Sequence, residues 1–354
     1  MNSKEVLNKY VCKHPFEYID IQTDADYVCC PSWCPTNIRA GEDLDWNSSN
    51  AKDIRKSVVD GSYRHCKHEI CPSLSSLLNT GLKPYNFYTK EEFEKKYDIK
   101  TVEDVDKFEK GPEEVLFGWD RSCNLKCPSC RINLIPNSKI NSKEHKAKVD
   151  LLEVVENKLG PTLKKIVVTG SGDPFYSNIY RDFLLNFDKS KYPSLENIQI
   201  ITNGKMLDKS LWDKLKAGPY IKQIEISIDA GTKETYENVT RLGGKWDKLL
   251  QNLEFISTIP TLSEVIISMV VSEKNYKEMD TFHTLISSIF KNSTFTLSIN
   301  FRQHIHWGTG KYTEQEVYQM QVFNKEHKDF LPFMQELLKV NNKQYVNHNF
   351  HHLL

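Results

Sequence analysis

Short runs of β-branched and aromatic residues recur along the chain, separated by segments whose apolar positions repeat at helical spacing. Runs of this kind predict strands, which we place at residues 115–119, 165–169, 197–202, 221–228, 265–271 and 294–301. The intervening segments, mostly bounded by Gly, Pro or Asn, predict helices at residues 144–159, 178–187, 208–216, 245–257 and 276–290. Strands that alternate with helices predict an α/β fold with a parallel sheet. Six such units predict a partial (β/α)6 barrel, with functional residues at the carboxyl ends of the strands.

The regions on either side of this pattern predict three further parts of the chain. Residues 1–85 form a small cysteine-rich module, and the charged stretch 86–112, which ends in a Gly-Pro breaker, is interpreted as a linker. The barrel then covers residues 113–310. Residues 311–354 are expected to form a helical extension that packs on its outside.

Composition and charge exclude several classes of protein. Lys+Arg and Asp+Glu number 47 each among 354 residues, so the net charge is zero and no nucleic-acid partner is expected. The longest apolar runs, such as residues 265–271, are far shorter than the ~18 residues that a membrane span needs. Charged residues near the start of the chain also argue against a signal peptide. We therefore expect a cytoplasmic protein that makes no contact with membranes.

The nine cysteines change this picture, because all of them lie before residue 131. In a reducing compartment, clustered cysteines bind metal or do chemistry more often than they form disulfides. Cys123, Cys127 and Cys130 form a C-x3-C-x2-C motif directly after the first predicted barrel strand. A structural zinc site needs four protein ligands, and no further Cys or His follows until His145. Three thiolates instead suit an iron–sulfur cluster whose open iron can bind a cofactor or substrate.

This motif, in the loop after the first strand, resembles that of the radical S-adenosylmethionine (SAM) superfamily, which has such a partial barrel. The resemblance implies a 4Fe-4S cluster on the three cysteines and SAM bound at the open iron. Segment 169–174 resembles the family's Gly-Gly-Glu-Pro motif, 203–204 its Thr-Asn-Gly turn, 227–229 its ribose-contacting position and 268–271 its adenine-facing strand. The residues implied to contact the cofactor are Gly170, Ser171, Gly172, Asp173, Asn203, Ser227, Asp229 and Met269. The departures are Ser171 in place of the first Gly and Asp173 in place of Glu in the Gly-Gly-Glu-Pro motif, and Ser129 in place of an aromatic residue.

The other six cysteines, together with a Trp-Asn-Ser and an Ile-Arg-Lys-Ser segment, resemble the SPASM/twitch auxiliary-cluster module of the same superfamily. In most relatives this module follows the barrel, whereas here it precedes it. A single auxiliary iron–sulfur cluster is implied, with Cys12, Cys30, Cys66 and Cys71 as ligands and Cys29 or Cys34 as alternatives. The spacing also permits a zinc knuckle built from Cys30, Cys34, Cys66 and Cys71.

The resemblance implies a radical SAM enzyme. Its reduced cluster would cleave SAM to a 5'-deoxyadenosyl radical, which abstracts hydrogen from a substrate, and an electron donor such as a flavodoxin or ferredoxin would reduce the cluster. Because residues 1–110 leave no evident room for a leader-peptide-binding domain, we expect a small polar substrate such as a carbohydrate, modified by epimerisation, dehydration or dehydrogenation. The alternatives are modification of a ribosomally made peptide and a non-catalytic metal-binding scaffold or redox protein.

Catalytic residues that donate or accept hydrogen stay unassigned. Arg121 and Arg131 flank the cysteine motif and either offset the charge of a cluster or lie at the surface. Arg241 resembles an arginine that relatives place near the cofactor. His304 and His306 end the sixth strand, where substrate-binding residues gather in barrels, but a structural role fits them equally well.

Overall fold

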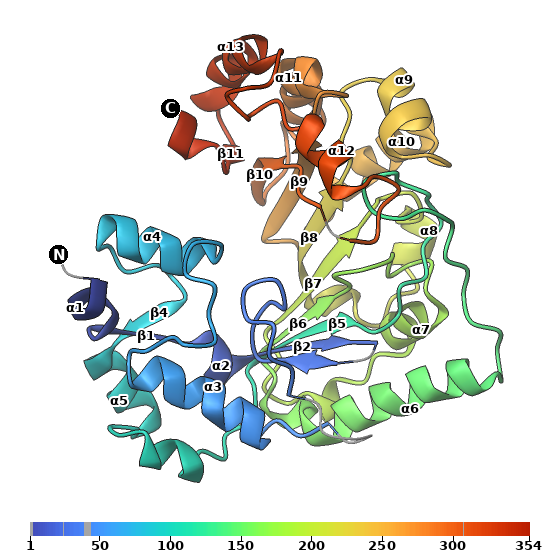
Figure 1. Ribbon diagram of the computed structural model, residues 1–354. Helices are drawn as coiled ribbons and strands as arrows, with labels where there is room; N and C mark the ends of the chain where they lie inside the picture. The colour runs from blue at the N-terminus through green and yellow to red at the C-terminus, as the bar shows by residue number, and fades with distance from the viewer. Residues whose placement is uncertain (1–2, 24, 39–43, 307) are drawn as a thin grey trace. The chain divides into compact units, whose positions relative to one another are not determined.

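The computed structural model describes residues 3–23, 25–38, 44–306 and 308–354, and the chain divides into two compact units (Figure 1). Unit 1 comprises Met1–Trp119, Lys146–Val167 and Lys189–Glu196. Unit 2 comprises Asp120–His145, Val168–Asp188 and Asn197–Leu354. This division differs from the predicted one, because the first two barrel strands belong to the same unit as the cysteine-rich region.

Unit 1 combines short N-terminal elements with the start of the barrel. Its main elements are α1 (Ser3–Leu7), β1 (Tyr10–Cys12), α2 (His14–Glu17), β2 (Tyr18–Gln22), β3 (Asp26–Tyr27), α3 (Ser49–Val59), α4 (Pro72–Thr80), β4 (Phe87–Thr89), α5 (Lys90–Tyr97), β5 (Glu114–Gly118), most of α6 (Lys143–Lys158) and most of β6 (Lys165–Val168). One sheet has the order β6-β5-β2-β3, in which β2 runs parallel to β5 and antiparallel to β3. Strands β1 and β4 form a separate antiparallel pair.

The stretch 86–112 is not a linker, which corrects the prediction. It contains β4, α5 and a 3-10 helix at Glu103–Lys107. A capping box between Thr89 and Glu92 begins α5, and its buried Phe93 packs edge-on against Phe16 of α2, with ring centroids 4.8 Å apart. The charges that suggested a linker lie on the solvent-facing side of α5. Amphipathic helices that bury a single aromatic residue carry little hydrophobic periodicity, which explains the error.

A buried arginine organises the core of unit 1. The Arg55 side chain is fully buried on α3, and its guanidinium lies 4.4 Å from the centre of the Trp46 ring and 5.0 Å from that of Phe108. It donates hydrogen bonds to the Pro15 and Trp46 carbonyls, at 2.7 and 2.9 Å, and to Asn47 Oδ1 at 2.8 Å. Burial lowers the pKa of Arg55 to about 9. The Trp-Asn-Ser and Ile-Arg-Lys-Ser segments therefore form one packed unit.

Unit 2 contains the rest of the barrel. Its main elements are α7 (Asn178–Asn186), β7 (Asn197–Thr202), α8 (Lys209–Trp212), β8 (Ile221–Ser227), α9 (Lys233–Thr235), a π-helical turn (Tyr236–Thr240), α10 (Trp246–Ile256), β9 (Glu264–Val271), α11 (Met279–Ile289), β10 (Thr296–Gln303), α12 (Glu314–Gln319), α13 (Phe330–Asn341) and β11 (Val346–His348). Strands β7, β8, β9, β10 and β11 pair in this order, all parallel. The predicted strands are thus present, and the chain has an α/β fold with mostly parallel strand pairing.

The C-terminal region is only partly helical. Helices α12 and α13 are present as expected, but β11 adds a strand to the parallel sheet, with Val346 opposite Ile299 and His348 opposite Phe301. A strand of three residues is too short to produce a recognisable alternation of polar and apolar positions. The helical extension predicted for residues 311–354 is corrected accordingly.

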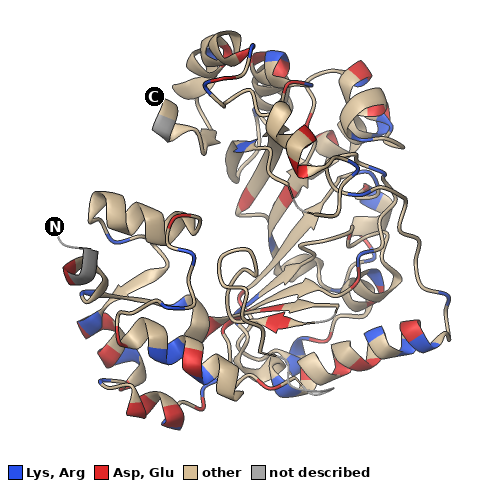
Figure 2. Cartoon of the chain, in the orientation of Figure 1, with Lys and Arg blue, Asp and Glu red and all other residues tan. Residues whose placement is uncertain are grey.

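The two faces of the sheet in unit 2 differ in polarity. On one face Ile226 and Leu249 of α10 both lie next to Gly204, and Phe301 packs against Phe282 of α11 with ring centroids 5.9 Å apart. Because side chains alternate along a strand, Glu225 and Ser268 point to the opposite face. Elsewhere, Lys, Arg, Asp and Glu are interspersed on the helices of both units (Figure 2). No helix in the described part of the chain is long and apolar enough to cross a membrane.

We predict that replacing Arg55 by Ala lowers the free energy of unfolding by on the order of 3 kcal/mol, because three hydrogen-bond acceptors lose a charged donor inside the core of unit 1. Arg64→Ala is the matched control, since Arg64 pairs with Asp53 and Asp60 at the surface and a surface ion pair contributes at most about 1 kcal/mol. Denaturant titration followed by circular dichroism measures both. Equal effects of the two substitutions would contradict the structural role of Arg55.

Candidate functional site

The three cysteines of the barrel motif lie in one irregular loop of unit 2. Cys123 and Cys127 are 5% and 3% exposed, and Cys130 is half-buried. Cys123 and Cys127 form a cluster with the fully buried Leu125, and Cys130 packs against this cluster. The Cys123 amide donates a 2.9 Å hydrogen bond to the Ile135 carbonyl, which closes the loop. The sequence motif therefore becomes a group of three thiols around one apolar side chain.

A buried aspartate fixes the start of this loop. Asp120 is 1% exposed, and its Oδ1 accepts hydrogen bonds from the amide and the hydroxyl of Ser122, at 3.2 and 2.8 Å. Its Oδ2 accepts a 2.6 Å bond from the hydroxyl of Ser177. The same hydroxyl caps α7 by accepting a hydrogen bond from the Tyr180 amide. The loop is thus fastened to a helix start inside the same unit.

A second buried carboxylate, Asp173, has a role that differs from the predicted one. Its Oδ2 accepts hydrogen bonds from the Thr202 hydroxyl and the Asn203 amide, at 2.7 and 3.0 Å. Its Oδ1 accepts from the amides of Phe175 and Tyr176, at 3.1 and 3.2 Å. The residue is fully buried, and burial raises its pKa. We therefore correct the predicted contact with a ligand's ammonium group: the structure makes Asp173 an anchor between the loop after β6 and the end of β7.

The loop after β6 is shaped by its approach to the cysteine loop. Gly172 has a φ of +105°, and a Cβ atom at this position would lie 2.8 Å from the Ser122 carbonyl oxygen, so only glycine fits. Thr169 has a φ of +68°, which is rare for a β-branched residue. Its hydroxyl donates to the Ser171 carbonyl and accepts from the Ser171 amide. Gly170 is exposed between them.

The predicted residue Asn203 contacts the cysteine loop directly. Its Nδ2 donates a 2.8 Å hydrogen bond to Asn124 Oδ1 and lies 3.8 Å from the Cys123 sulfur. The backbone amide of Asn203 is held by Asp173. Asn203 therefore connects the end of β7 to the first cysteine of the motif.

Two arginines lie beside the thiols. Arg131 Nη2 lies 3.2 Å from the Cys130 sulfur, and its Nη1 donates to the Arg121 carbonyl. Arg241 Nη1 lies 3.5 Å from the Cys127 sulfur. Guanidinium groups at these distances stabilise thiolates and offset the negative charge of a thiolate-bound cluster. The sequence left both arginines undecided, and for Arg241 the only signal was a resemblance. The Arg121 side chain is exposed.

Arg241 also joins the cysteine loop to the end of β8. Its Nη2 forms a 2.7 Å ion pair with Asp229 Oδ2, and Asp229 Oδ1 accepts a 2.8 Å hydrogen bond from the Val270 amide. Asp229 is 5% exposed, with a φ of +60°. The ends of β8 and β9 are therefore held together by one carboxylate.

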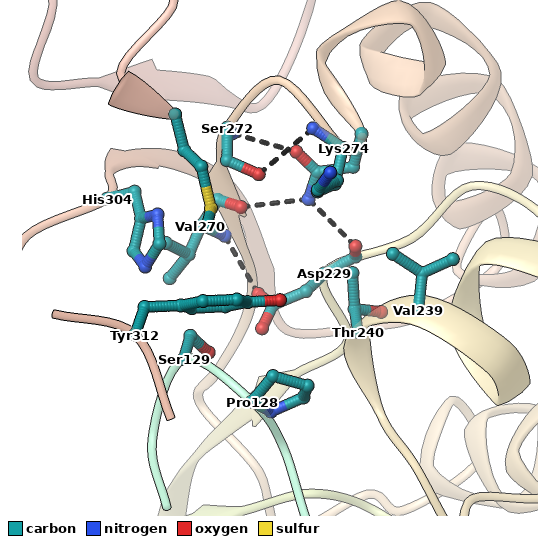
Figure 3. Close-up of a pocket in the computed structure, with 12 residues that line it drawn as sticks. Pro128, Ser129, Asp229, Val239, Thr240, Val270, Ser272, Lys274, His304 and Tyr312 are labelled. Atoms are coloured by element: carbon teal, nitrogen blue, oxygen red, sulfur yellow. Dashed lines mark hydrogen bonds between the residues drawn. The ribbon is translucent and has the colours of Figure 1, made fainter. Parts of the chain in front are cut away.

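A pocket opens next to this carboxylate (Figure 3). Its walls include Pro128 and Ser129 of the cysteine loop, Asp229, His304 and Tyr312. Of the eight predicted cofactor contacts, only Asp229 is in its described lining. Ser227 is absent from it, and Met269 is fully buried while its neighbour Val270 faces the pocket. Tyr312 was missed, because nothing in its local sequence marks it.

Five of the six N-terminal cysteines line one hollow of unit 1. They are Cys12, Cys29, Cys34, Cys66 and Cys71, and the hollow measures about 480 Å³ including its mouth. Burial, together with the neighbouring Cys71 and Cys34 thiols, raises the pKa of Cys12 to about 12. Five thiols around one space are enough for the four ligands of a closed iron–sulfur cluster.

Cys30 lies apart from this group, which corrects the predicted ligand set. It does not line the hollow; burial raises its pKa, and its neighbours are Ser32, Trp33 and Asp20. Cys29 lines the hollow with the other thiols, whereas the adjacent Cys30, which follows a bend in the chain, does not. In the described residues no group of three or more Cys, His, Asp or Glu side chains is arranged to hold a single metal ion.

Comparison with known proteins agrees with the geometry of the cysteine loop. The family model described as the Radical SAM superfamily matches residues 121–286. A GTP 3',8-cyclase of Petrotoga mobilis is 25% identical over 186 residues, which cover 51% of this chain and 54% of that protein. A GTP 3',8-cyclase of Clostridium perfringens is 26% identical over 231 residues, covering 63% and 65%.

The solved structure of native anSMEcpe with bound AdoMet shares 17% identity and a TM-score of 0.43, covering 66% of this chain and 63% of that one. The chain spans between about half and two thirds of the length of the two cyclases, and the match to the superfamily includes all three cysteines of the motif. Residues 121–286 of the chain are therefore similar to the radical SAM superfamily.

Proposed function

We propose that the chain is a radical SAM enzyme in which Cys123, Cys127 and Cys130 hold a 4Fe-4S cluster and SAM binds at its open iron. The observation that carries this proposal is the position of Arg241, whose guanidinium contacts both the Cys127 sulfur and Asp229 in the pocket wall. One side chain thus links the cluster loop to a pocket next to it. A ligand that contacts both the cluster and the pocket requires such an arrangement.

When bound at Cys123, Cys127 and Cys130, the cluster together with SAM would supply the radical chemistry that removes a hydrogen atom from the substrate. The chain's own residues bind and orient them. Arg131 and Arg241 offset negative charge at the cysteine loop, and burial of Cys123 and Cys127 keeps water from the sulfur atoms. Asp229 retains lone pairs for hydroxyl donors beside its bonds to Arg241 and Val270. An electron donor such as a flavodoxin or ferredoxin is the expected redox partner.

For the substrate we propose a small polar molecule with hydroxyl groups. Glu225 is 7% exposed on the face of the sheet opposite α10 and α11. It accepts a 3.0 Å hydrogen bond from the Ser268 hydroxyl and forms a 3.0 Å ion pair with Arg302. Ser268 is aligned with Asn300 on the next strand, and Asn300 Oδ1 is buried with no hydrogen-bond partner among the described residues. Such a polar sheet face suits hydroxyl groups better than apolar peptide side chains.

We propose that the hollow of unit 1 holds one auxiliary iron–sulfur cluster with Cys12, Cys66 and Cys71 as ligands, and with Cys29 or Cys34 rather than Cys30 as the fourth. The support is the gathering of the five thiols. Such a cluster could anchor the substrate or take an electron from the product radical. The alternative of a zinc knuckle requires Cys30, and the placement of that residue disfavours it.

The radical chemistry predicts that Cys127→Ala abolishes the formation of deoxyadenosine. The assay uses protein that is reconstituted anaerobically with iron and sulfide and then reduced by dithionite in the presence of SAM. The iron content should fall by about four per chain. Cys30→Ala is the control and should retain full activity, because Cys30 lies outside both thiol groups. If the wild-type protein forms no deoxyadenosine, the non-catalytic scaffold is correct instead.

The ligand assignment in unit 1 is tested on a background in which Cys123, Cys127 and Cys130 are all replaced by Ala, so that only auxiliary iron is counted. Cys66→Ala should then lose the bound iron and its visible absorbance, whereas Cys30→Ala should keep both. Comparing Cys29→Ala with Cys34→Ala by the same measurement identifies the fourth ligand. Loss of metal in the Cys30 variant, or zinc in place of iron, would overturn the assignment.

The substrate class is tested by the rate of deoxyadenosine formation with GTP, with a nucleotide sugar and with a short cysteine-containing peptide. We expect at least one polar small molecule to raise the rate, and Glu225→Gln to reduce this stimulation roughly tenfold or more by removing a charged hydrogen-bond acceptor. The rate without substrate should not change. Stimulation by the peptide alone would favour the peptide-modifying alternative.

A further inference from the structure

Two polar side chains in the wall of the five-thiol hollow have buried atoms without partners. His14 Nδ1 and Asn86 Oδ1 are buried and form no hydrogen bond among the described residues. A third polar residue of the same wall, Tyr63, differs, because its hydroxyl donates a 2.8 Å hydrogen bond to the Tyr10 carbonyl. Buried polar groups in folded proteins nearly always have a partner. The two unpaired atoms therefore indicate that the hollow takes a group with which they can pair.

The backbone holds both side chains next to a proposed cluster ligand. Strands β1 and β4 lie side by side in unit 1 (Figure 1), with Cys12 opposite Phe87. Directly beyond this pair, the Lys13 amide donates a 3.0 Å hydrogen bond to the Asn86 carbonyl. His14 follows as the first residue of α2. Cys12, His14 and Asn86 are therefore placed by one short stretch of paired backbone.

The rest of the wall limits what the missing partner can be. Apart from the thiols and the polar groups, it consists mainly of apolar side chains, which include Pro15, Ile54, Val58, Leu74 and Phe87. An iron–sulfur cluster in this space offers sulfide and thiolate sulfur atoms, which accept hydrogen bonds and donate none. The backbone already makes one such contact, since the His14 amide donates a hydrogen bond to the Cys12 sulfur.

Both side chains can present an N–H group to a sulfur atom. Nδ1 of an imidazole carries hydrogen in the charged form and in one tautomer of the neutral form. A half-turn of the Asn86 amide exchanges its oxygen for its NH2 group. Coordination of iron by His14 is disfavoured, because the five thiols exceed the four ligands that a closed cluster needs.

We propose that the His14 and Asn86 side chains donate hydrogen bonds to sulfur atoms of the auxiliary cluster and thereby raise its reduction potential. The inference rests on the proposed function, because it requires a cluster in this hollow. Reduction adds one electron to the cluster, without making or breaking a bond, and increases the negative charge on its sulfur atoms. N–H groups that point at these atoms stabilise the reduced form more than the oxidised form.

The test is a potentiometric titration followed by electron paramagnetic resonance, on the chain in which Cys123, Cys127 and Cys130 are replaced by Ala. His14→Phe keeps an aromatic ring and removes both nitrogen atoms. It should make reduction roughly tenfold less favourable, which lowers the potential of a one-electron couple by about 59 mV. His14→Gln, which restores an N–H group, should recover part of this shift. A merely structural role of the ring would give no such recovery.

Asn86→Leu has nearly the same shape without polar atoms and should lower the potential by a similar amount. This variant keeps the inference testable even if His14→Phe loses the cluster. His65→Phe is the matched control: His65 is adjacent to the proposed ligand Cys66, but it pairs with Asp53 at the surface and does not line the hollow. Its potential should equal that of the parent protein.

Iron content, measured in every variant, separates this inference from the proposed function. Unchanged potentials in His14→Phe and Asn86→Leu, at full iron content, overturn the inference and leave the cluster in place. Strong nitrogen coupling in pulsed electron paramagnetic resonance that disappears in His14→Phe makes His14 an iron ligand and also overturns its role as a donor. If the parent protein binds no iron, the proposed auxiliary cluster fails and this inference with it. Deoxyadenosine formation by the wild type tests the radical site independently.

Discussion

The cysteine loop has no helix or strand to shape it, so its form depends on buried carboxylates that accept hydrogen bonds from nearby backbone amides and side-chain hydroxyl groups. Asp173 accepts four such bonds and ties the loop after β6 to the end of β7. Asp120 does the same between the loop and the start of α7. A buried carboxylate is stable only when its oxygens are well paired. The start of the cysteine loop, the loop after β6 and the end of β7 are therefore each held in one position.

Positive charge completes this arrangement. Arg131 and Arg241 bring guanidinium groups to the sulfur atoms of Cys130 and Cys127, and Arg241 adds an ion pair with Asp229. The same contacts that offset thiolate charge also position the pocket wall. The shape of the cysteine loop, its charge balance and the wall of the pocket are therefore linked in unit 2. A substitution that changes one of these three properties also changes the other two.

Unit 1 reaches a similar result with an arginine in place of a carboxylate. Arg55 has no buried acidic partner in the described contacts; it is held by aromatic rings and by carbonyl groups, including that of Pro15. Pro15 lies three residues after Cys12, so the buried arginine fixes the segment that carries one of the five thiols. The charged stretch that resembles a linker in sequence in fact supplies Phe93 and Phe108 to this core.

The sequence by itself determined the order of strands and helices between residues 115 and 301 and the three-cysteine motif that resembles the radical SAM superfamily, because periodicity and ligand spacing are local properties of the chain. It could not show that Cys29 rather than Cys30 faces the other thiols, since the direction of a side chain depends on the backbone path. Nor could it show that both carboxylate oxygens of Asp173 accept hydrogen bonds from within the protein, or that Tyr312 and Ser129 line the same pocket. These relations join residues tens to nearly two hundred positions apart, and only the folded chain brings such residues together.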